Sequence, residues 1–195
     1  MSMEEKPATG ARLRPWTDSA ADVQAVIAAF DADDMAAQAA EPINGEEAAR
    51  RWLAPWLEPD GSHVAAFAID CGGMALGHVM AGAIDRRHQT AWISYWVSPL
   101  GRGKGLASAA LATLAEHCFE TLGLHRLELA HRTNNPVSGR VAMAAGFLVE
   151  GLEREKLMYL NEMGEPVRFD VQTLARLRTD PAPQITALEI VNMSA

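Results

Sequence analysis

The clearest succession of structural signals lies in the middle of the chain. Residues 91–97, AWISYWV, are a run of apolar, β-branched and aromatic side chains, which is typical of a buried strand. Pro99 ends this run, because proline lacks the backbone donor that a strand needs. Apolar residues then recur at helical spacing over residues 103–122, and Gly123 supplies a stop. This stretch therefore predicts a buried strand, a glycine-rich turn and a helix.

The first part of the chain predicts one short strand and two helices. Residues 11–16 favour a strand that ends at a proline, and residues 19–30 place their apolar side chains on one face of a helix. A second helix is expected over residues 45–57, whose first turn is acidic. Pro55 lies inside this pattern, so we expect it to kink or shorten the helix.

Short turns separate most of the remaining elements. Residues 71–73, CGG, indicate a hairpin, and a third strand follows the turn at residues 85–90, so three strands form an antiparallel meander. The order of strand, helix and strand over residues 91–130 predicts a right-handed crossover, which makes its two strands parallel. Gly151 is expected to mark a β-bulge. The elements expected here are strands at residues 62–70, 74–84, 91–97 and 126–130, a helix at 136–145, and strands at 147–160 and 167–177.

Together these elements predict an α+β protein with a central mixed, mostly antiparallel sheet of about seven strands, flanked by about four helices. The length of 195 residues fits one domain with a sizeable core. We expect a disordered leader over residues 1–10, the domain over residues 11–178 and a tail over residues 179–195. The apolar residues 185–191 of the tail predict either an edge strand or packing on a partner subunit, so a homodimer is compatible with the sequence.

Composition and charge limit the classes of partner. The formal net charge of −8 argues against a nucleic-acid partner and suits a cationic amine substrate. No apolar run is long enough to span a bilayer, and residues 1–10 do not resemble a signal peptide, so no membrane partner is expected. Cys71 and Cys118 lie far apart, which favours reduced thiols in the cytoplasm, and we expect Cys118 in the core rather than as a nucleophile. No metal is expected.

The glycine-rich turn RGKGLAS at residues 102–108 has the chemistry of an anion site. Glycines allow the backbone to approach a phosphate closely, and the free N–H groups of a first helical turn point towards it. Arg102 and Lys104 add positive charge at the same place. The alternative is a tight turn with ordinary capping, because short glycine motifs are weak and this one lacks both the Walker A spacing and a complete G-x-G-x-x-G.

Two motifs resemble the GNAT superfamily of N-acetyltransferases. The first is [QR]-x-x-G-x-[GA], present as Arg102, Gly105 and Ala107 soon after residues 95–97, YWV. The second is residues 134–147, NNPVSGRVAMAAGF, which resemble the N-x-x-S…GF segment of the RimJ/RimL-type members. Two motifs at the right separation are far more specific than either alone, so the resemblance implies a single GNAT-like domain.

The resemblance implies a sheet that splays between its fourth and fifth strands, with the pantetheine arm of acetyl-CoA in the opening. The glycine-rich turn would hold the pyrophosphate, and Asn135 and Ser138 match cofactor-side polar positions. A strand without a neighbour leaves backbone groups that the amides of pantetheine can bond. Asn135 also suits a plain helix cap. The expected cofactor-binding residues are Tyr95, Trp96, Val97, Arg102, Gly103, Lys104, Gly105, Leu106, Ala107, Ser108, Asn135 and Ser138.

The activity implied by this resemblance is acetyl-CoA-dependent transfer of an acetyl group to a primary amine of a small molecule or a peptide N-terminus. The amine would attack the thioester directly in a ternary complex, where bringing the reactants together lowers much of the barrier. Two alternatives stay open. One is an acyl-CoA-binding module with weak or lost chemistry, and the other is a transferase that uses a different donor such as succinyl-CoA.

The resemblance leaves the catalytic residues incompletely assigned. Ser138 is the candidate proton donor to the departing thiolate. The chain departs from the family at positions where relatives carry glutamate or tyrosine, because it has Trp92, Ala142 and residues 157–158, LM. No general base is therefore assigned. The candidates for the base are Asp31, Asp34, Glu128, His131 and Tyr95.

An acidic cluster of Asp31, Asp33 and Asp34 follows the first helix, where the resembled fold places one wall of the acceptor cleft. A carboxylate there would attract an ammonium ion and orient it before deprotonation. We therefore expect Asp31 and Asp34 to act on the amine. The alternative is that these aspartates are solvated loop charges.

Overall fold

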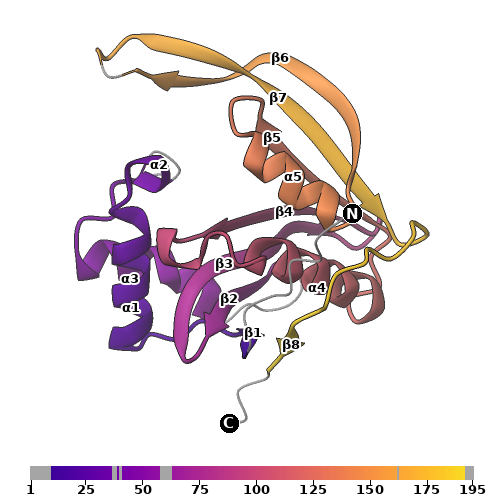
Figure 1. Cartoon of the computed structure of the whole chain (residues 1–195), viewed down its shortest axis with the longest axis horizontal. Coiled ribbons are helices and arrows are strands. Elements are labelled where there is room, and N and C mark those ends of the chain that lie inside the picture. Colours follow the sequence, from indigo (N-terminus) through magenta and orange to yellow (C-terminus); the bar gives the residue numbers. More distant parts are fainter. Residues whose placement is uncertain (1–9, 37–38, 40, 58–62, 162, 192–195) are drawn as a thin grey trace.

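The computed structural model describes residues 10–36, 39, 41–57, 63–161 and 163–191, so the expected leader lies almost entirely outside it. A single mixed sheet of eight strands, in the order β6-β7-β5-β4-β3-β2-β1-β8, runs through the described part of the protein (Figure 1). Its strands are β1 (Ala11–Arg14), β2 (Ala65–Cys71), β3 (Met74–Asp85), β4 (Thr90–Val97), β5 (Arg126–Arg132), β6 (Leu148–Leu160), β7 (Pro166–Leu177) and β8 (Glu189–Ile190).

Helices cover both faces of the sheet. Ala68 of β2 packs in one hydrophobic cluster with the first helices of the chain, whereas its neighbours Phe67 and Ile69 pack in another cluster with the later helices. Successive side chains of a strand point to opposite faces, so the two clusters lie on opposite sides of the sheet. The helices are α1 (Ala20–Phe30), α2 (Asp33–Ala36), α3 (Glu46–Leu57), the 3-10 turn η1 (Pro99–Gly101), α4 (Leu106–Glu120) and α5 (Pro136–Ala144).

The α+β class and the topology predicted from the sequence are confirmed. Strands β2, β3 and β4 form the antiparallel meander, and β4, α4 and β5 form the crossover with parallel strands. The sheet has one strand more than the expected seven, because β8 of the tail pairs in parallel with β1. The backbone N–H of Val191 also donates to the carbonyl of Leu13 at 2.8 Å. The tail therefore forms an edge strand, which was one of the two predicted arrangements.

Two helices differ from their predicted ends. Helix α4 begins at Leu106 rather than at residue 103, because Gly103 and Gly105 have φ angles of 71° and 67°, in the left-handed region that ends a helix. Helix α3 continues past Pro55 to Leu57, so the expected shortening is wrong. Pro55 removes the hydrogen bond that residue 55 would donate to the carbonyl of Arg51, but it lies in the last turn of α3 and only two residues of the helix follow it.

The sheet opens between β4 and β5, as the resemblance implies. These strands pair only over Thr90 with Arg126, Ala91 with Leu127 and Trp92 with Glu128. Beyond this point β4 continues beside β3, and β5 continues beside β7, so the two central strands diverge. The opening exposes the backbone edge of β4 near its C-terminal end, directly before the glycine-rich turn.

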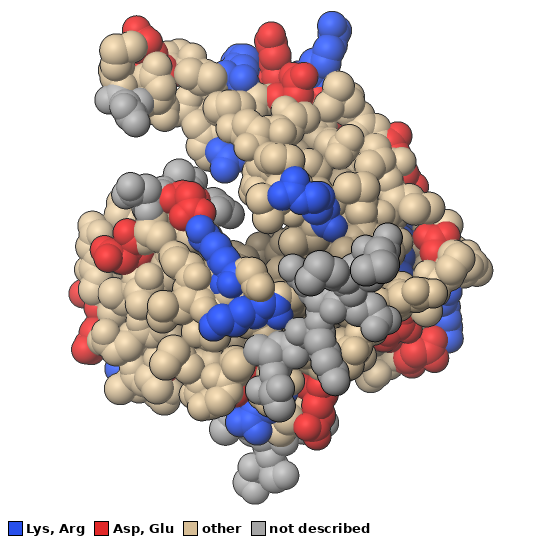
Figure 2. Space-filling model, viewed as in Figure 1, with Lys and Arg blue, Asp and Glu red and all other residues tan. Residues whose placement is uncertain are grey.

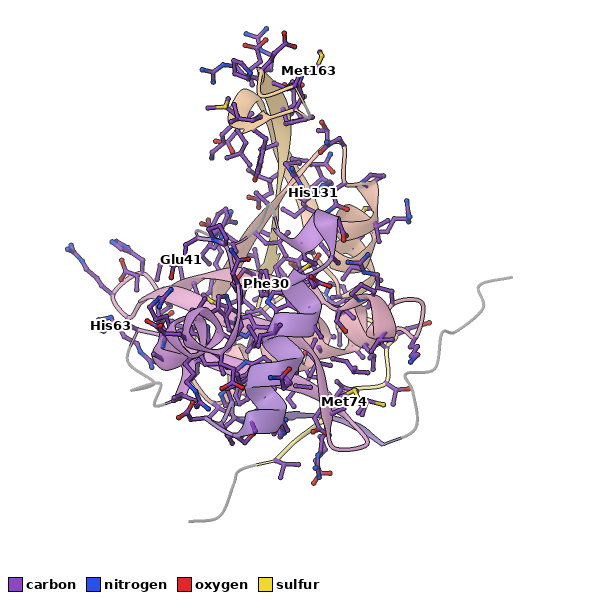
Figure 3. All side chains as sticks on the ribbon, turned by 90° about the vertical axis from the view of Figure 1, so that its left-hand side faces the viewer. Phe30, Glu41, His63, Met74, His131 and Met163 are labelled. Carbon is purple, nitrogen blue, oxygen red and sulfur yellow. The ribbon has the colours of Figure 1, made fainter. Side chains whose placement is uncertain are left out.

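Strands β6 and β7 form a long hairpin, residues 148–177, which we call the arm. It arches away from the body over α5 in Figure 1, and Figure 3 shows Met163 at its tip. The register of the arm shifts between Val149 and Gly151, which confirms the predicted bulge, and again between Glu153 and Leu157. Such bulges bend a strand, which is consistent with the curvature of the arm.

The structure confirms that Cys118 belongs to the core, as predicted. Cys118 lies in the core with no exposed surface, and burial raises the pKa of its thiol to about 12. A thiol this buried and this weakly acidic is not a nucleophile at neutral pH. Among the described residues, no helix is both long and apolar enough to cross a membrane.

Candidate active site

The glycine-rich turn between β4 and α4 presents backbone donors to an open surface. Gly105 caps α4 in a left-handed conformation, and a Cβ atom placed on Gly103 would meet no atom within 4 Å. The N–H groups of residues 106–108 precede the first helical hydrogen bond, which runs from Ala109 N to Gly105 O at 3.1 Å. These N–H groups and the positive end of the α4 dipole can therefore bind an anion.

Two basic side chains are held beside this turn. Arg102 Nη2 lies 2.8 Å from Asp34 Oδ2 of α2, and Arg102 Nε donates to the carbonyl of Val97 at 3.3 Å. Lys104 Nζ donates to the carbonyl of Leu100 at 2.7 Å. The turn thus keeps two cations near its backbone donors, while Asp34 offsets part of the charge of Arg102.

A pocket of about 610 Å³ lies between this turn, the end of β4, α2 and α5. We call it the anion pocket. Figure 2 shows a hollow between the arm and the lobe that contains α2, with basic side chains on both of its sides. The pocket is lined by all the predicted cofactor-binding residues except Lys104, together with Asp34, Met35, Gly101, Val137, Arg140, Val141 and Ala144.

A second pocket of about 300 Å³ lies in the opening between β4 and β5, beneath the arm. We call it the arm pocket. Three residues, Tyr95, Asn135 and Ser138, belong to the walls of both pockets, so the two pockets meet there. The other residues of the arm pocket are Trp92, Ile93, Ser94, Leu129, Ala130, His131, Arg132, Lys156, Leu157, Tyr159 and Val171.

Hydrogen bonds fix the groups at the junction of the pockets. Asn135 caps α5 as predicted, because its side chain accepts from Ser138 N at 3.3 Å. The Tyr95 hydroxyl donates to the carbonyl of Ser138 at 2.8 Å and lies 2.9 Å from Ser138 Oγ. Burial raises the pKa of Tyr95, although its bond to Ser138 acts in the opposite direction. The junction therefore holds two neutral hydroxyl groups in contact. Because the proton of Tyr95 is donated to the carbonyl of Ser138, the Ser138 hydroxyl is the group that can donate to a negative atom placed between the pockets.

The other predicted bases are engaged elsewhere. His131 lies beneath the arm (Figure 3), where its Nδ1 contacts the carbonyl of Arg132 at 2.9 Å and its Nε2 contacts Gln172 Oε1 at 3.1 Å. Glu128 lies 2.6 Å from Arg126 and does not line either pocket. Both ring nitrogens of His131 and the carboxylate of Glu128 thus have partners already.

The structure does not bring Asp31 and Asp34 to the arm pocket. Asp34 lines the anion pocket, where it contacts Arg102, and exposed Asp31 caps the C-terminus of α1 without lining either pocket. The side chain of Asp33 lies outside the described part. A role for Asp31 or Asp34 at the acceptor amine stays a prediction, and the position of Asp34 favours a role in holding Arg102.

Sequence reasoning missed the charged and aromatic residues that close the arm pocket. The strand predicted over residues 126–130 does not include Arg132, but Arg132 is the last residue of β5 and points at the arm. Lys156 and Tyr159 come from the arm itself. Their spacing from the motif residues gives no indication of this contact, because it depends on how far the arm bends.

The geometry suits a reaction between two ligands. An anionic ligand can bind at the turn and extend along the exposed edge of β4 to the junction of the pockets. A second ligand in the arm pocket would then reach the same junction from the opposite side. The Ser138 hydroxyl there, held by Tyr95, can stabilise negative charge that develops between the ligands.

Comparison with known proteins agrees with this geometry. The ribosomal-protein-serine acetyltransferase of Escherichia coli (strain K12) is 31% identical over 94 residues, which are 48% of this chain and 52% of that protein. The spermidine N(1)-acetyltransferase of the same organism is 32% identical over 116 residues, which are 58% of this chain and 62% of that protein. The chain therefore spans only about half the length of several curated relatives that it matches.

A solved structure and a family model extend the match. The structure of Mycobacterium smegmatis RimJ in complex with CoA-disulfide superimposes with a TM-score of 0.67 at 28% identity, and covers 86% of this chain and 82% of that one. The model of the acetyltransferase (GNAT) domain matches residues 11–148, which is more than half of the chain. This protein is therefore a member of the GNAT acetyltransferase family.

Proposed function

We propose that this protein transfers an acetyl group from acetyl-CoA to a primary amine of a small molecule or a peptide N-terminus. The observation that carries the proposal is the meeting of two pockets at Tyr95 and Ser138, one of which ends at an anion-binding turn. The family match and relatives named as acetyltransferases of ribosomal proteins and of spermidine support it.

The residues of the anion pocket fit acetyl-CoA. The turn offers backbone donors, Arg102 and Lys104 to phosphates, and the edge of β4 beyond Trp92 offers backbone groups to the amides of pantetheine. Acetyl-CoA supplies the thioester carbonyl and a thiolate as leaving group. Because a thiol has a pKa of about 8.5, the thiolate leaves readily and needs little stabilisation by the protein.

The protein's contribution is mainly orientation and charge stabilisation. Ser138 donates a hydrogen bond towards the position of the leaving sulfur, and Tyr95 holds Ser138 in place. The amine occupies the arm pocket and reaches the junction as a neutral nucleophile. The described walls of the arm pocket contain no aspartate or glutamate, so no side-chain carboxylate there serves as the base.

Two measurements test the proposal. CoA should raise the melting temperature, because it binds the folded state only, and purified protein should release CoA thiol from acetyl-CoA when amines are added. Binding without thiol release for any amine would indicate the alternative of a binding module. Release with succinyl-CoA but not acetyl-CoA would change the donor. A homodimer and a cytoplasmic location stay predictions, and the two free cysteines, Cys71 and Cys118, support the latter.

A further inference from the structure

Arg132 differs from the other arginines that the structure buries. Four arginines in the described part of the chain are at least partly buried, namely Arg14, Arg126, Arg132 and Arg176. Three of them contact a carboxylate: Arg14 contacts Asp22 and Asp70, Arg126 contacts Glu128 and Glu150, and Arg176 contacts Glu116. Arg132 lies against aromatic rings instead, and no carboxylate of the described residues lies within ion-pair distance of it.

The aromatic contacts hold the Arg132 guanidinium in a defined position. Its Cζ lies 4.4 Å from the centre of the Tyr159 ring and 5.9 Å from the centre of the Phe169 ring. These two rings contact each other edge to face at 6.0 Å. A stacked guanidinium keeps its N–H edge available, and this edge matches a carboxylate with two parallel hydrogen bonds. Strand β5 thus presents to the arm pocket an anion-binding group that the rings of the arm keep in order.

The charge around Arg132 is positive. The charged side chains that line the arm pocket are Arg132 and Lys156, with His131 beside them. Lys156 Nζ lies 2.6 Å from Glu153 Oε2, so its charge is largely compensated. Glu153 occupies the same cross-strand row as Arg132, with Val171 between them, but its carboxylate bonds to Lys156. Arg132 is therefore the uncompensated cation of this pocket among the described residues.

Resting on the proposed function, we propose that the acceptor is a carboxylate-bearing amine whose carboxylate binds Arg132. Its amine then points along the pocket to Ser138 at the junction. Free amino acids and acidic peptide N-termini share this chemistry.

Matched acceptors distinguish these two sources. One pair of acceptors consists of amidated peptides that begin with Ala-Glu and Ala-Gln. The other pair consists of the amino acid alanine and its amide, alaninamide. Each kcat/KM is calculated with the concentration of the neutral form of the amine, so that differences in amine pKa between acceptors do not affect the comparison. Spermidine serves as a cationic acceptor. Because a hydrogen bond to a charged group contributes strongly, kcat/KM of the wild type should favour the carboxylate member of at least one pair by about 10- to 100-fold. The pair that shows the preference identifies the source.

Variants assign the preference to Arg132. Arg132→Gln should reduce it to within about threefold, because the amide keeps bulk but loses the charge. Arg132→Lys should restore part of it. The matched control is Arg154→Gln, which removes an exposed arginine of the arm that lines neither pocket. The CoA-induced shift in melting temperature should be the same in all four proteins, which shows that folding and the anion pocket are intact.

The inference and the proposed function fail in different ways. A wild type that acetylates neutral amines or spermidine best, or a preference that Arg132→Gln leaves unchanged, overturns the anion site while acetyl transfer stands. If the wild type acetylates none of the amines tested, the proposed function is overturned, and the acceptor assignment with it.

Discussion

The contact between Tyr95 and Ser138 gives the sharpest test of the proposed chemistry. Tyr95 has one hydroxyl proton and donates it to the carbonyl of Ser138 at 2.8 Å. The Ser138 hydroxyl, 2.9 Å from Tyr95 Oη, is then the group that is free to turn its proton to the sulfur. Ser138→Ala should therefore remove the donor itself, whereas Tyr95→Phe should remove only the group that positions it.

The expected magnitudes follow from these roles. Removing a donor to developing negative charge in a protected site lowers kcat by about 10²- to 10³-fold where the anion is a strongly basic oxygen. A thiolate is much less basic, so we expect Ser138→Ala to lower kcat by about 10- to 100-fold. Tyr95→Phe loses one net hydrogen bond of about 1 kcal/mol, which corresponds to a loss in kcat of roughly fivefold.

Single-turnover release of CoA thiol, followed with saturating amine, measures the chemical step. The affinity for CoA should change by less than about threefold in both variants, because the glycine-rich turn and the other wall residues of the anion pocket stay in place. Tyr95→Phe should also lower the melting temperature by about 2–4 °C, the change expected for a loss of about 1 kcal/mol in a domain of this size. The double variant should be no slower than Ser138→Ala alone, since Tyr95 acts through Ser138.

Two results would refute this reasoning. An unchanged single-turnover rate in Ser138→Ala would return Ser138 to an ordinary helix residue. A larger loss in Tyr95→Phe than in Ser138→Ala would make the tyrosine the donor. In that case the raised pKa of Tyr95 would keep the group neutral, so the rate should stay independent of its ionisation at neutral pH.

Three further predictions concern the anion pocket and the core. Gly105→Glu should abolish the rise in melting temperature with CoA, while Gly105→Ala, which strains the same backbone without adding charge, should keep part of it. Asp34→Asn should tighten CoA binding at low salt by removing a negative charge beside Arg102; a raised KM for the amine with unchanged CoA affinity would instead support the acceptor role predicted from sequence. Burial lowers the pKa of His78 to about 3, so only the unfolded chain binds a proton at this residue between that pH and about 6.5. The contribution of His78 to the free energy of unfolding should therefore fall by about 1.4 kcal/mol for each pH unit below 6.5, and urea unfolding of His78→Gln should lack this contribution. Equal slopes of unfolding free energy against pH in the wild type and in His78→Gln would contradict the prediction.

Much of the fold was predictable because its signals are local. Asn135 caps α5 and Ser19 caps α1 through bonds to residues only three positions away. The apolar run of β4 and the glycines before α4 likewise act within a few residues. Such features depend on backbone geometry that a short sequence window fixes. The anion pocket was predictable for the same reason, since one turn supplies most of its polar groups.

The arm pocket was not predictable in this way, because its walls come from segments that are distant in the sequence. Strands β4, β5, β6 and β7 and the start of α5 contribute to it, and the bend of the arm decides which side chains of β6 arrive there. That bend depends on two register shifts, at Gly151 and between Glu153 and Leu157. The sequence indicated the first shift through its glycine. The second shift involves Glu155, which has a φ of 53° although it is not a glycine, so the sequence contains no signal for it.

The second shift also explains why the net charge does not show the local charge of this pocket. Arg126 and Arg132 lie on β5 at an even separation, so both side chains point to the same face. Arg126 meets Glu150 before the shift and is neutralised, whereas Arg132 meets Tyr159 after the shift and keeps its charge. The net charge of −8 is a sum over the whole surface, and it cannot show which of two equivalent arginines is left without a carboxylate. The sign of the electrostatic field in the arm pocket therefore depends on the register of β6. Deleting one residue between Glu153 and Leu157 should reset this register, and the proposed preference for carboxylate-bearing amines should then disappear.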